Sequence, residues 1–168
     1  MPDEDGWPTF EEWRGTLSED RRARVDALVT TMRNAGAREP EEWARSEVEE
    51  DIAQAARFSF LRAVWRDLDQ WRNEATTEAY LAELDVDAAV RERLGGVLAK
   101  VALQAALDVV MVLDNEEDVG SVDELPGWRL MELDTEGNLS GRDVGGLHES
   151  FYDVDPRDRS DGEDITGW

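Results

Sequence analysis

Hydrophobic side chains are densest between residues 87 and 114, where their spacing is that of a long helix. They recur in steps of three and four residues, at Val90, Leu94, Val97, Leu98, Val101, Ala105, Val109, Val112 and Leu113. Such steps keep side chains on one face of an α-helix. After residue 100 only Gln104 and Asp108 are polar, so the second half of this helix is apolar on nearly every side.

A helix that is apolar on nearly every side is normally enclosed by other elements. The pattern therefore predicts a helix over about 87–113 at the centre of the core, with Leu98 and Val109 buried. Shorter periodic segments predict helices at 19–34, at 41–72 (one helix, or two joined near 56–59) and at 77–84. Ser18 is suited to cap the first of these and Gly36 to end it.

From residue 125 the pattern changes to one typical of strands. Apolar and polar residues alternate on both sides of the segment 134–137, which ends in glycine and has the composition of a hairpin loop. The sequence thus predicts a mainly α fold, a bundle of four to five helices around the long helix, with a small C-terminal β-hairpin at 128–144. We expect an N-terminal arm over 1–17, a single helical domain over 18–155 and an acidic polar tail over 156–168.

The hairpin segment also has a second interpretation, as a calcium-binding loop. Its acidic residues and glycine fall at loop positions 1, 3, 5, 6 and 12, with Glu132 first and Asp143 last. Calcium loops normally have Asp at position 1 and Glu at position 12, and here the two are exchanged. The hairpin is favoured, and we expect neither a metal ion nor a cofactor.

The formal net charge of −23 narrows the range of partners. Residues 114–168 carry 17 acidic and 4 basic side chains, which is more than half of the excess. Such a surface repels nucleic acid phosphates and anionic lipids and attracts basic proteins. Arginines alternate with aromatic residues over 57–72, a pattern found in single-strand binding, but neighbouring acids cancel their charge. We expect a basic protein partner, with no direct nucleic acid and no membrane.

The same composition has an explanation that needs no partner. Lys100 is the only lysine, against 17 arginines, and acid-rich, lysine-poor chains are typical of cytosolic proteins adapted to salt. The chain has no cysteine and no basic or apolar segment near Met1, so we expect a cytoplasmic protein. The long helix is expected to be a core helix, because Lys100, Gln104 and Asp108 leave its apolar runs shorter than a bilayer requires.

His148 is the only histidine and the only candidate for a general base. Glu149 or Asp153 could orient it, which leaves a small hydrolase-type enzyme as an alternative. The chain has no metalloprotease, phosphate-loop or nucleophile-elbow motif. No catalytic residue is therefore assigned, and a non-enzymatic role is favoured.

The favoured interpretation is an acidic binding protein that engages or neutralises a basic partner, as inhibitors and immunity proteins do. The alternatives are the enzyme that uses His148 and a structural domain whose acidity reflects only salt adaptation. The expected binding residues lie in the acidic C-terminal third, which also offers aromatic anchors. They are Glu116, Glu117, Asp118, Trp128, Arg142, Asp143, His148, Glu149 and Tyr152.

Overall fold

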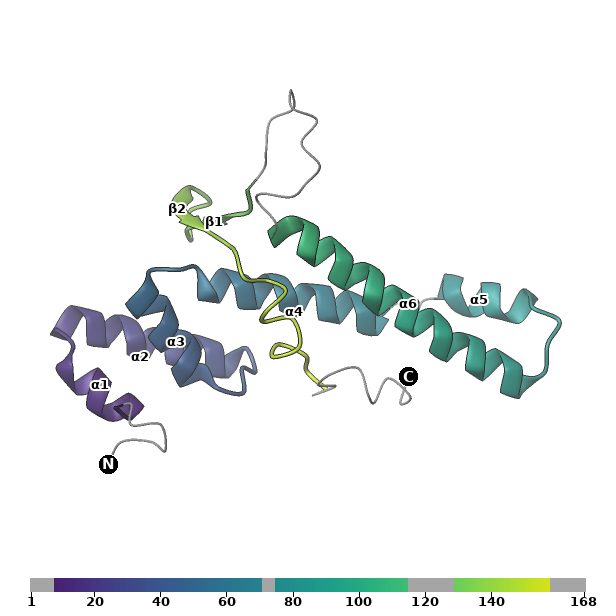
Figure 1. Cartoon of the computed structure of the whole chain (residues 1–168), viewed down its shortest axis with the longest axis horizontal. Coiled ribbons are helices and arrows are strands. Elements are labelled where there is room, and N and C mark those ends of the chain that lie inside the picture. The colour runs from purple at the N-terminus through teal and green to yellow at the C-terminus, as the bar shows by residue number, and fades with distance from the viewer. Residues whose placement is uncertain (1–7, 71–74, 115–128, 158–168) are drawn as a thin grey trace, which may run out of the picture. The chain divides into compact units, whose positions relative to one another are not determined.

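The computed structural model describes residues 8–70, 75–114 and 129–157. The fold is mainly α (Figure 1), as the sequence predicts. Its elements are α1 (Phe10–Thr16), α2 (Glu19–Asn34), α3 (Pro40–Glu50), α4 (Gln54–Gln70), α5 (Ala75–Glu83), α6 (Ala88–Asp114), β1 (Met131–Leu133) and β2 (Leu139–Asp143). The long helix and the C-terminal hairpin are both confirmed.

Contacts between residues divide the chain into two compact units. Unit 1 comprises Met1–Arg57 and Leu130–Val144, and unit 2 comprises Phe58–Arg129 and Gly145–Trp168. The hairpin β1–β2 therefore belongs with α1, α2 and α3. The long helix α6 belongs with most of α4 and with the segment that follows the hairpin.

The core of unit 1 lies among its first three helices. It is formed by Trp13, Val25, Val29, Ala44 and Val48, with Phe10, Leu17 and Leu28 packed against it. The expected N-terminal arm contains the short helix α1, which begins with a capping box at Thr9 and buries Trp13. Helix α2 begins after a Ser18 cap, and Gly36 follows it with φ of 84°, as predicted.

The break between α3 and α4 lies several residues nearer the N-terminus than the join predicted from the sequence. The break lies at residues 51–53, where Asp51 ends α3 in the left-handed region with φ of 55°. The predicted join at 56–59 is wrong, since α4 runs unbroken from Gln54. Asp51 is one of the few residue types besides glycine that adopt this conformation at modest cost.

The hairpin of unit 1 is antiparallel and irregular. Met131 pairs with Asp143 and Leu133 with Leu139, with a shift of register between them. Asp134 closes the loop, because its Oδ1 accepts hydrogen bonds from the backbone N–H of Glu136 and of Asn138, both at 2.9 Å. These bonds, above all the one from Asn138, hold the pKa of Asp134 below its usual value. The loop is thus a side-chain-stabilised turn, with Gly137 at φ of 85°.

Unit 2 has its own buried apolar residues. They are Phe58, Leu61, Trp65, Leu68, Leu81, Ala99, Leu103, Val110, Leu147, Phe151 and Val154. Trp65 stacks against Phe151 with ring centroids 4.8 Å apart, and its Nε1 donates a 2.7 Å hydrogen bond to the Phe151 carbonyl. These contacts fix the turns of residues 147–154 in this unit.

Helix α6 is buried along one face only, which differs from the expectation. Asp87 caps it by accepting from the Val90 N–H at 2.8 Å, and four of its residues, Gly95, Ala99, Leu103 and Val110, are buried. Leu98 is 43% exposed and Val109 is 58% exposed, so the prediction that both are buried is wrong. Within the described ranges this is also the single helix that could cross a bilayer by length and composition alone.

Candidate functional site

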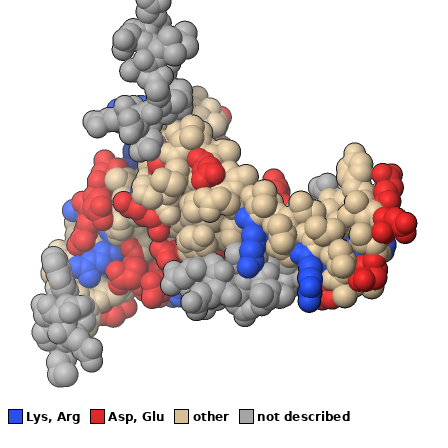
Figure 2. Space-filling view, turned by 45° about the vertical axis from the view of Figure 1, so that its right-hand side comes forward, with Lys and Arg blue, Asp and Glu red and all other residues tan. Residues whose placement is uncertain are grey.

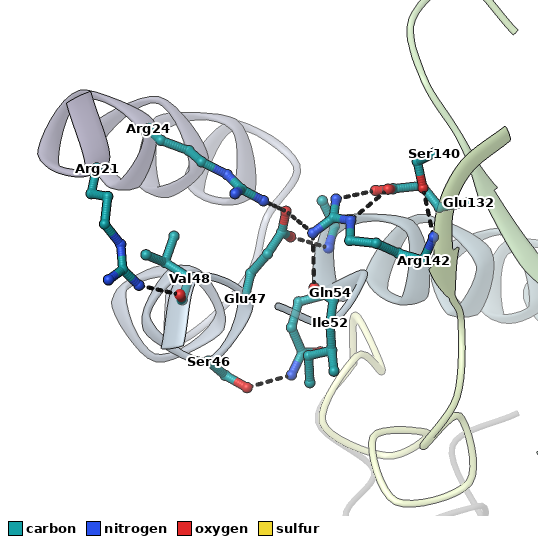
Figure 3. A network of polar contacts seen from close by, with 11 residues as sticks. Arg21, Arg24, Ser46, Glu47, Val48, Ile52, Gln54, Glu132, Ser140 and Arg142 are labelled. Atoms are coloured by element: carbon teal, nitrogen blue, oxygen red, sulfur yellow. Dashed lines mark hydrogen bonds and ion pairs between the residues drawn. The ribbon is translucent and has the colours of Figure 1, made fainter. Parts of the chain in front are cut away.

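A buried ion network joins the helices of unit 1 to its hairpin (Figure 3). Arg142 on β2 donates two hydrogen bonds to Glu132 on β1, from Nε at 2.8 Å and from Nη2 at 2.6 Å. Its Nη1 donates to Glu47 Oε1 at 3.1 Å. Glu47 lies on α3 and is only 2% exposed, and it also pairs with Arg24 of α2 at 3.4 Å.

This network also satisfies the backbone where α3 gives way to α4. Arg142 Nη1 donates to the carbonyl of Ile52 at 3.1 Å, and Glu47 Oε2 accepts from the N–H of Ala55 at 2.9 Å. The Ala55 N–H lies in the first turn of α4 and has no helical partner, and the Ile52 carbonyl at the break also accepts from the Gln54 N–H at 3.0 Å. Partial burial acts to lower the pKa of Arg142, but the hydrogen bonds to Glu132 and Glu47 outweigh it and raise the pKa. Two arginines and two glutamates leave the network close to neutral.

Arg142 was predicted to contact a partner, and its guanidinium is committed inside unit 1. All three of its nitrogens donate to Glu132, Glu47 or Ile52. The neighbouring Asp143 is half-buried and is also engaged within the chain. The geometry gives Arg142 a part in attaching the hairpin to α3 and to the start of α4.

The second polar site lies at the end of α6, in unit 2. Asp114 Oδ2 lies 2.6 Å from His148 Nδ1 and accepts from the His148 N–H at 2.6 Å, and its Oδ1 accepts from the Leu147 N–H at 2.8 Å. The Asp114 side chain is 4% exposed and that of His148 is 46% exposed. A carboxylate at a helix C-terminus opposes the helix dipole, and here two backbone N–H groups and the imidazole stabilise it.

The carboxylate beside His148 is not one of those considered from the sequence. Glu149 and Asp153 are exposed, whereas Asp114, 34 residues away, holds the ring. This arrangement fixes the imidazole through Nδ1, which is how a general base is oriented. The Asp114 carboxylate also caps the turn that starts at Leu147, by accepting from the N–H groups of Leu147 and His148. These contacts can therefore have a purely structural role.

The other predicted binding residues fall into two groups. Tyr152 is half-buried and packs edge-on against Phe151, with ring centroids 5.3 Å apart. Glu149 and His148 are exposed beside it in sequence. The acidic residues at 116–118 and Trp128 lie outside the described residues.

Each unit also has a hollow on its surface. The one in unit 2, about 520 Å³, is lined by Ser59, Arg62, Ala63, Arg66, Asp69, Gln70 and Pro156. The one in unit 1, about 390 Å³, is lined by Phe10, Glu11, Arg14, Asp26, Val29, Thr30, Arg33 and Glu41. His148 lines neither of them. No group of three or more His, Asp or Glu side chains that could hold a metal ion occurs within the described parts of the chain.

Glu47 and Asp114 are the polar residues that sequence reasoning missed. Glu47 falls at the helical positions of the buried face of α3, seven residues after Pro40 and one before Val48, and that periodicity was the available signal. Asp114 stands at the end of a long apolar run, and nothing in the sequence links it to His148. Comparison with protein families, with curated proteins and with solved structures finds no match for this chain.

Proposed function

We propose that this protein is a non-enzymatic binding protein that engages a basic protein partner, in the manner of an inhibitor or immunity protein. One observation carries the proposal. Every described arginine of unit 1 has a partner within the chain, and the acidic side chains there outnumber the arginines, so the excess charge presented to a partner is negative.

Every arginine in the described part of unit 1 has an intramolecular partner. Arginine contacts to carboxylates or backbone carbonyls are made by Arg14, Arg21, Arg22, Arg24, Arg33, Arg45 and Arg142, and Arg38 and Arg57 are also engaged. The same residues include 16 acidic side chains against 9 arginines. The excess acids include Glu19, Asp20, Glu39, Glu42, Asp51 and Glu136, all exposed. In Figure 2, Asp and Glu side chains outnumber Lys and Arg on the visible face.

A field of this kind accelerates the approach of a cationic protein, and apolar anchors then slow its departure. We place the contact in the C-terminal third, at Glu116, Glu117 and Asp118, together with the exposed Glu149 and the half-buried Tyr152. Asp114 is excluded from this set, because backbone N–H groups and His148 already stabilise its carboxylate.

The experiment is affinity capture from a native lysate with three baits. The first is the natural chain, and the second carries Lys in place of Glu116, Glu117 and Asp118. The third is a matched control with the same change of charge, in which Lys replaces Glu39, Glu42 and Glu136, three exposed acids of unit 1.

A basic protein retained by the natural chain and by the control, but lost from the second bait, would support the proposal. Equal loss from both variants would mean that the charge acts only in bulk and that the contact site is wrong. If no basic protein is retained by the natural chain at about 0.15 M salt, where charges interact over about 8 Å, the proposal fails.

A second candidate function rests on the Asp114–His148 pair. The ring is held through Nδ1 at 2.6 Å and the side chain is 46% exposed, so Nε2 could serve as a general base in hydrolysis. Activated esters provide a simple test. Hydrolysis that disappears in both His148→Ala and Asp114→Asn, while the variants stay folded, would favour this candidate, and rates equal to that of the natural chain would remove it.

A further inference from the structure

The hollow of unit 2, about 520 Å³ in volume, lies along one side of α4. The helix contributes Ser59, Arg62, Ala63, Arg66, Asp69 and Gln70 to its lining. At 100° per residue these positions span about 120° of the helix surface, on the side away from the buried Leu61 and Leu68. The segment that follows the hairpin runs beside α4 (Figure 1) and adds Pro156 to the lining.

Arg62 and Arg66 give this hollow its chemical character. They are separated by one helical turn, about 6 Å along the axis, and both belong to the lining. Ser59 and Ala63 lie on the same face, and their short side chains leave space between the two arginines and the neighbouring wall. Two guanidinium forks at this spacing can donate to the oxygens of one tetrahedral anion from two sides.

The half-buried Arg62 has neutral partners only, within the ranges that the structure describes. Its Nη1 donates to the carbonyl of Val154 at 3.5 Å, which is longer than an ordinary N–H···O hydrogen bond. Its Cζ lies 6.0 Å from the centroid of the Phe58 ring. The chain has 41 acidic side chains against 18 lysines and arginines, so an arginine whose charge no carboxylate balances is unusual in it.

The other charges around the hollow leave Arg66 available as well. Asp69 is the one acidic residue among the described lining residues, and it pairs with Arg157 at 3.5 Å. Arg66 pairs with the adjacent Asp67 at 2.9 Å, but their side chains are 62% and 69% exposed. Ion pairs as exposed as this one contribute little. An anion in the hollow can therefore compete with Asp67 for the Arg66 guanidinium.

The hollow of unit 1 has the opposite character. Its two arginines, Arg14 and Arg33, each pair with a carboxylate of the same hollow, Asp26 and Glu41 respectively. Glu11 adds a third acid to that lining. Of the two hollows, the one in unit 2 therefore favours an anion.

We infer that the hollow beside Arg62 and Arg66 binds a small phosphate monoester, with the phosphate on the two arginines and the organic part against Ala63 and Pro156. A phosphate monoester carries about 1.5–2 negative charges at pH 7 and three acceptor oxygens, which suit two guanidinium forks and the Ser59 hydroxyl. The volume lies within the range of about 300–1,000 Å³ typical of small-molecule sites, and is more than inorganic phosphate needs. The inference is independent of the proposed protein partner.

The charge of the chain limits the ligand to a small one. A net charge of −23 repels a long polyanion such as nucleic acid along its whole length. For a small ligand at 0.15 M salt, repulsion from exposed carboxylates more than about 8 Å away is largely screened. The contacts inside the hollow then decide whether it binds.

Titration of the full chain with phenyl phosphate at 0.15 M KCl, followed by calorimetry and ¹⁵N NMR, tests the site. We expect a dissociation constant on the order of 0.1–1 mM and shifts of the Nε–H resonances of Arg62 and Arg66. Arg66→Gln should raise this constant at least about fivefold. The matched control is Arg33→Gln, because the Arg33 side chain is 60% exposed against 62% for Arg66, and it should leave the constant unchanged.

Further variants separate recognition in the hollow from bulk charge. Asp67→Asn releases Arg66 from its exposed pair and should lower the dissociation constant about twofold or more. Asp85→Asn makes the same change of charge at an exposed residue outside the lining and should have a smaller effect. Arg66→Lys keeps the charge but loses the planar fork, so it should raise the constant about threefold or more. Phenol, which lacks the phosphate, should not bind.

Three results would overturn the inference. The first is an absence of shifts in the Arg62 and Arg66 resonances up to about 10 mM phenyl phosphate, well above the expected dissociation constant. The second is an equal loss of affinity in Arg66→Gln and Arg33→Gln, which would show that net charge alone acts. The third is binding that occurs only when Asp161, Glu163 and Asp164 are all changed to the corresponding amides, because the acidic tail would then be the occupant of the hollow.

Discussion

Glu47→Ala should be among the most destabilising single substitutions in unit 1. The carboxylate is 2% exposed and accepts two short hydrogen bonds, from Arg142 at 3.1 Å and from the Ala55 N–H at 2.9 Å. A hydrogen bond to a charged group contributes about 1.5–3 kcal/mol, and breaking a buried ion pair costs about 3–5 kcal/mol. Arg142 keeps Glu132 as a partner, so we expect the lower end of this range, about 3 kcal/mol.

Urea unfolding followed by circular dichroism measures this loss. At a slope of about 2 kcal/mol per molar urea, a loss of about 3 kcal/mol lowers the midpoint by roughly 1.5 M. Glu47→Gln keeps the shape and one acceptor for the Ala55 N–H, so it should cost less. Combining Glu47→Gln with Arg142→Met should cost clearly less than the sum of the two single changes, because they share one interaction.

The matched control is Arg33→Ala. Its pair with Glu41 has side chains that are 60% and 37% exposed, and exposed pairs contribute about 0–1 kcal/mol. If Glu47→Ala costs no more than Arg33→Ala, or less than about 1 kcal/mol, the network does not hold the hairpin on the helices and the reasoning is refuted.

Four further outcomes are expected. If the acidity reflects salt adaptation, the melting temperature should climb strongly between about 0.05 and 1 M KCl, because the Debye length falls to about 3 Å and repulsion among the carboxylates is screened. A melting temperature that does not change over this range favours the proposal of a basic protein partner. Trp65→Phe leaves the buried Phe151 carbonyl without its donor and should lower the free energy of unfolding by about 1–3 kcal/mol in the same urea assay. Leu103→Ala, at a buried position, should cost about 2–4 kcal/mol, whereas Leu98→Ala, at a position that is 43% exposed, should cost under about 1 kcal/mol. A hydrogen bond from Arg14 lowers the pKa of Asp26. The ionised Asp26 therefore contributes to the free energy of unfolding above the ordinary aspartate pKa near 3.9, and this contribution is lost as pH falls through the pKa of the folded state. Acid unfolding of Asp26→Asn should accordingly depend less on pH below about 4.

The features that could be predicted from sequence are those set by neighbouring residues. Ser18 caps α2 and Asp87 caps α6, and Asp134 with Gly137 makes the hairpin loop. In each case a side chain bonds to backbone within four residues, or glycine supplies a positive φ. Such signals survive in any tertiary context, and for that reason the element types were correct.

The features that could not be predicted depend on residues far apart in the sequence. The break after Asp51 has no glycine or proline to mark it, and it is stabilised by Arg142 from 90 residues away. Asp114 and His148 are likewise joined across 34 residues. Side chains that looked available for a partner, above all Arg142, are occupied by these distant contacts, and no local pattern shows that.

Helix α6 shows why hydrophobic periodicity alone leaves the core ambiguous. Its exposed and its buried apolar residues both recur in helical steps, and the exposed ones include more of the large side chains. The buried face has Gly95 and Ala99, whose small size lets other elements approach the helix closely. A prediction from apolar surface area alone would therefore place the wrong face of α6 in the core. Burial depends on how well two surfaces fit together as well as on how much apolar surface each one offers.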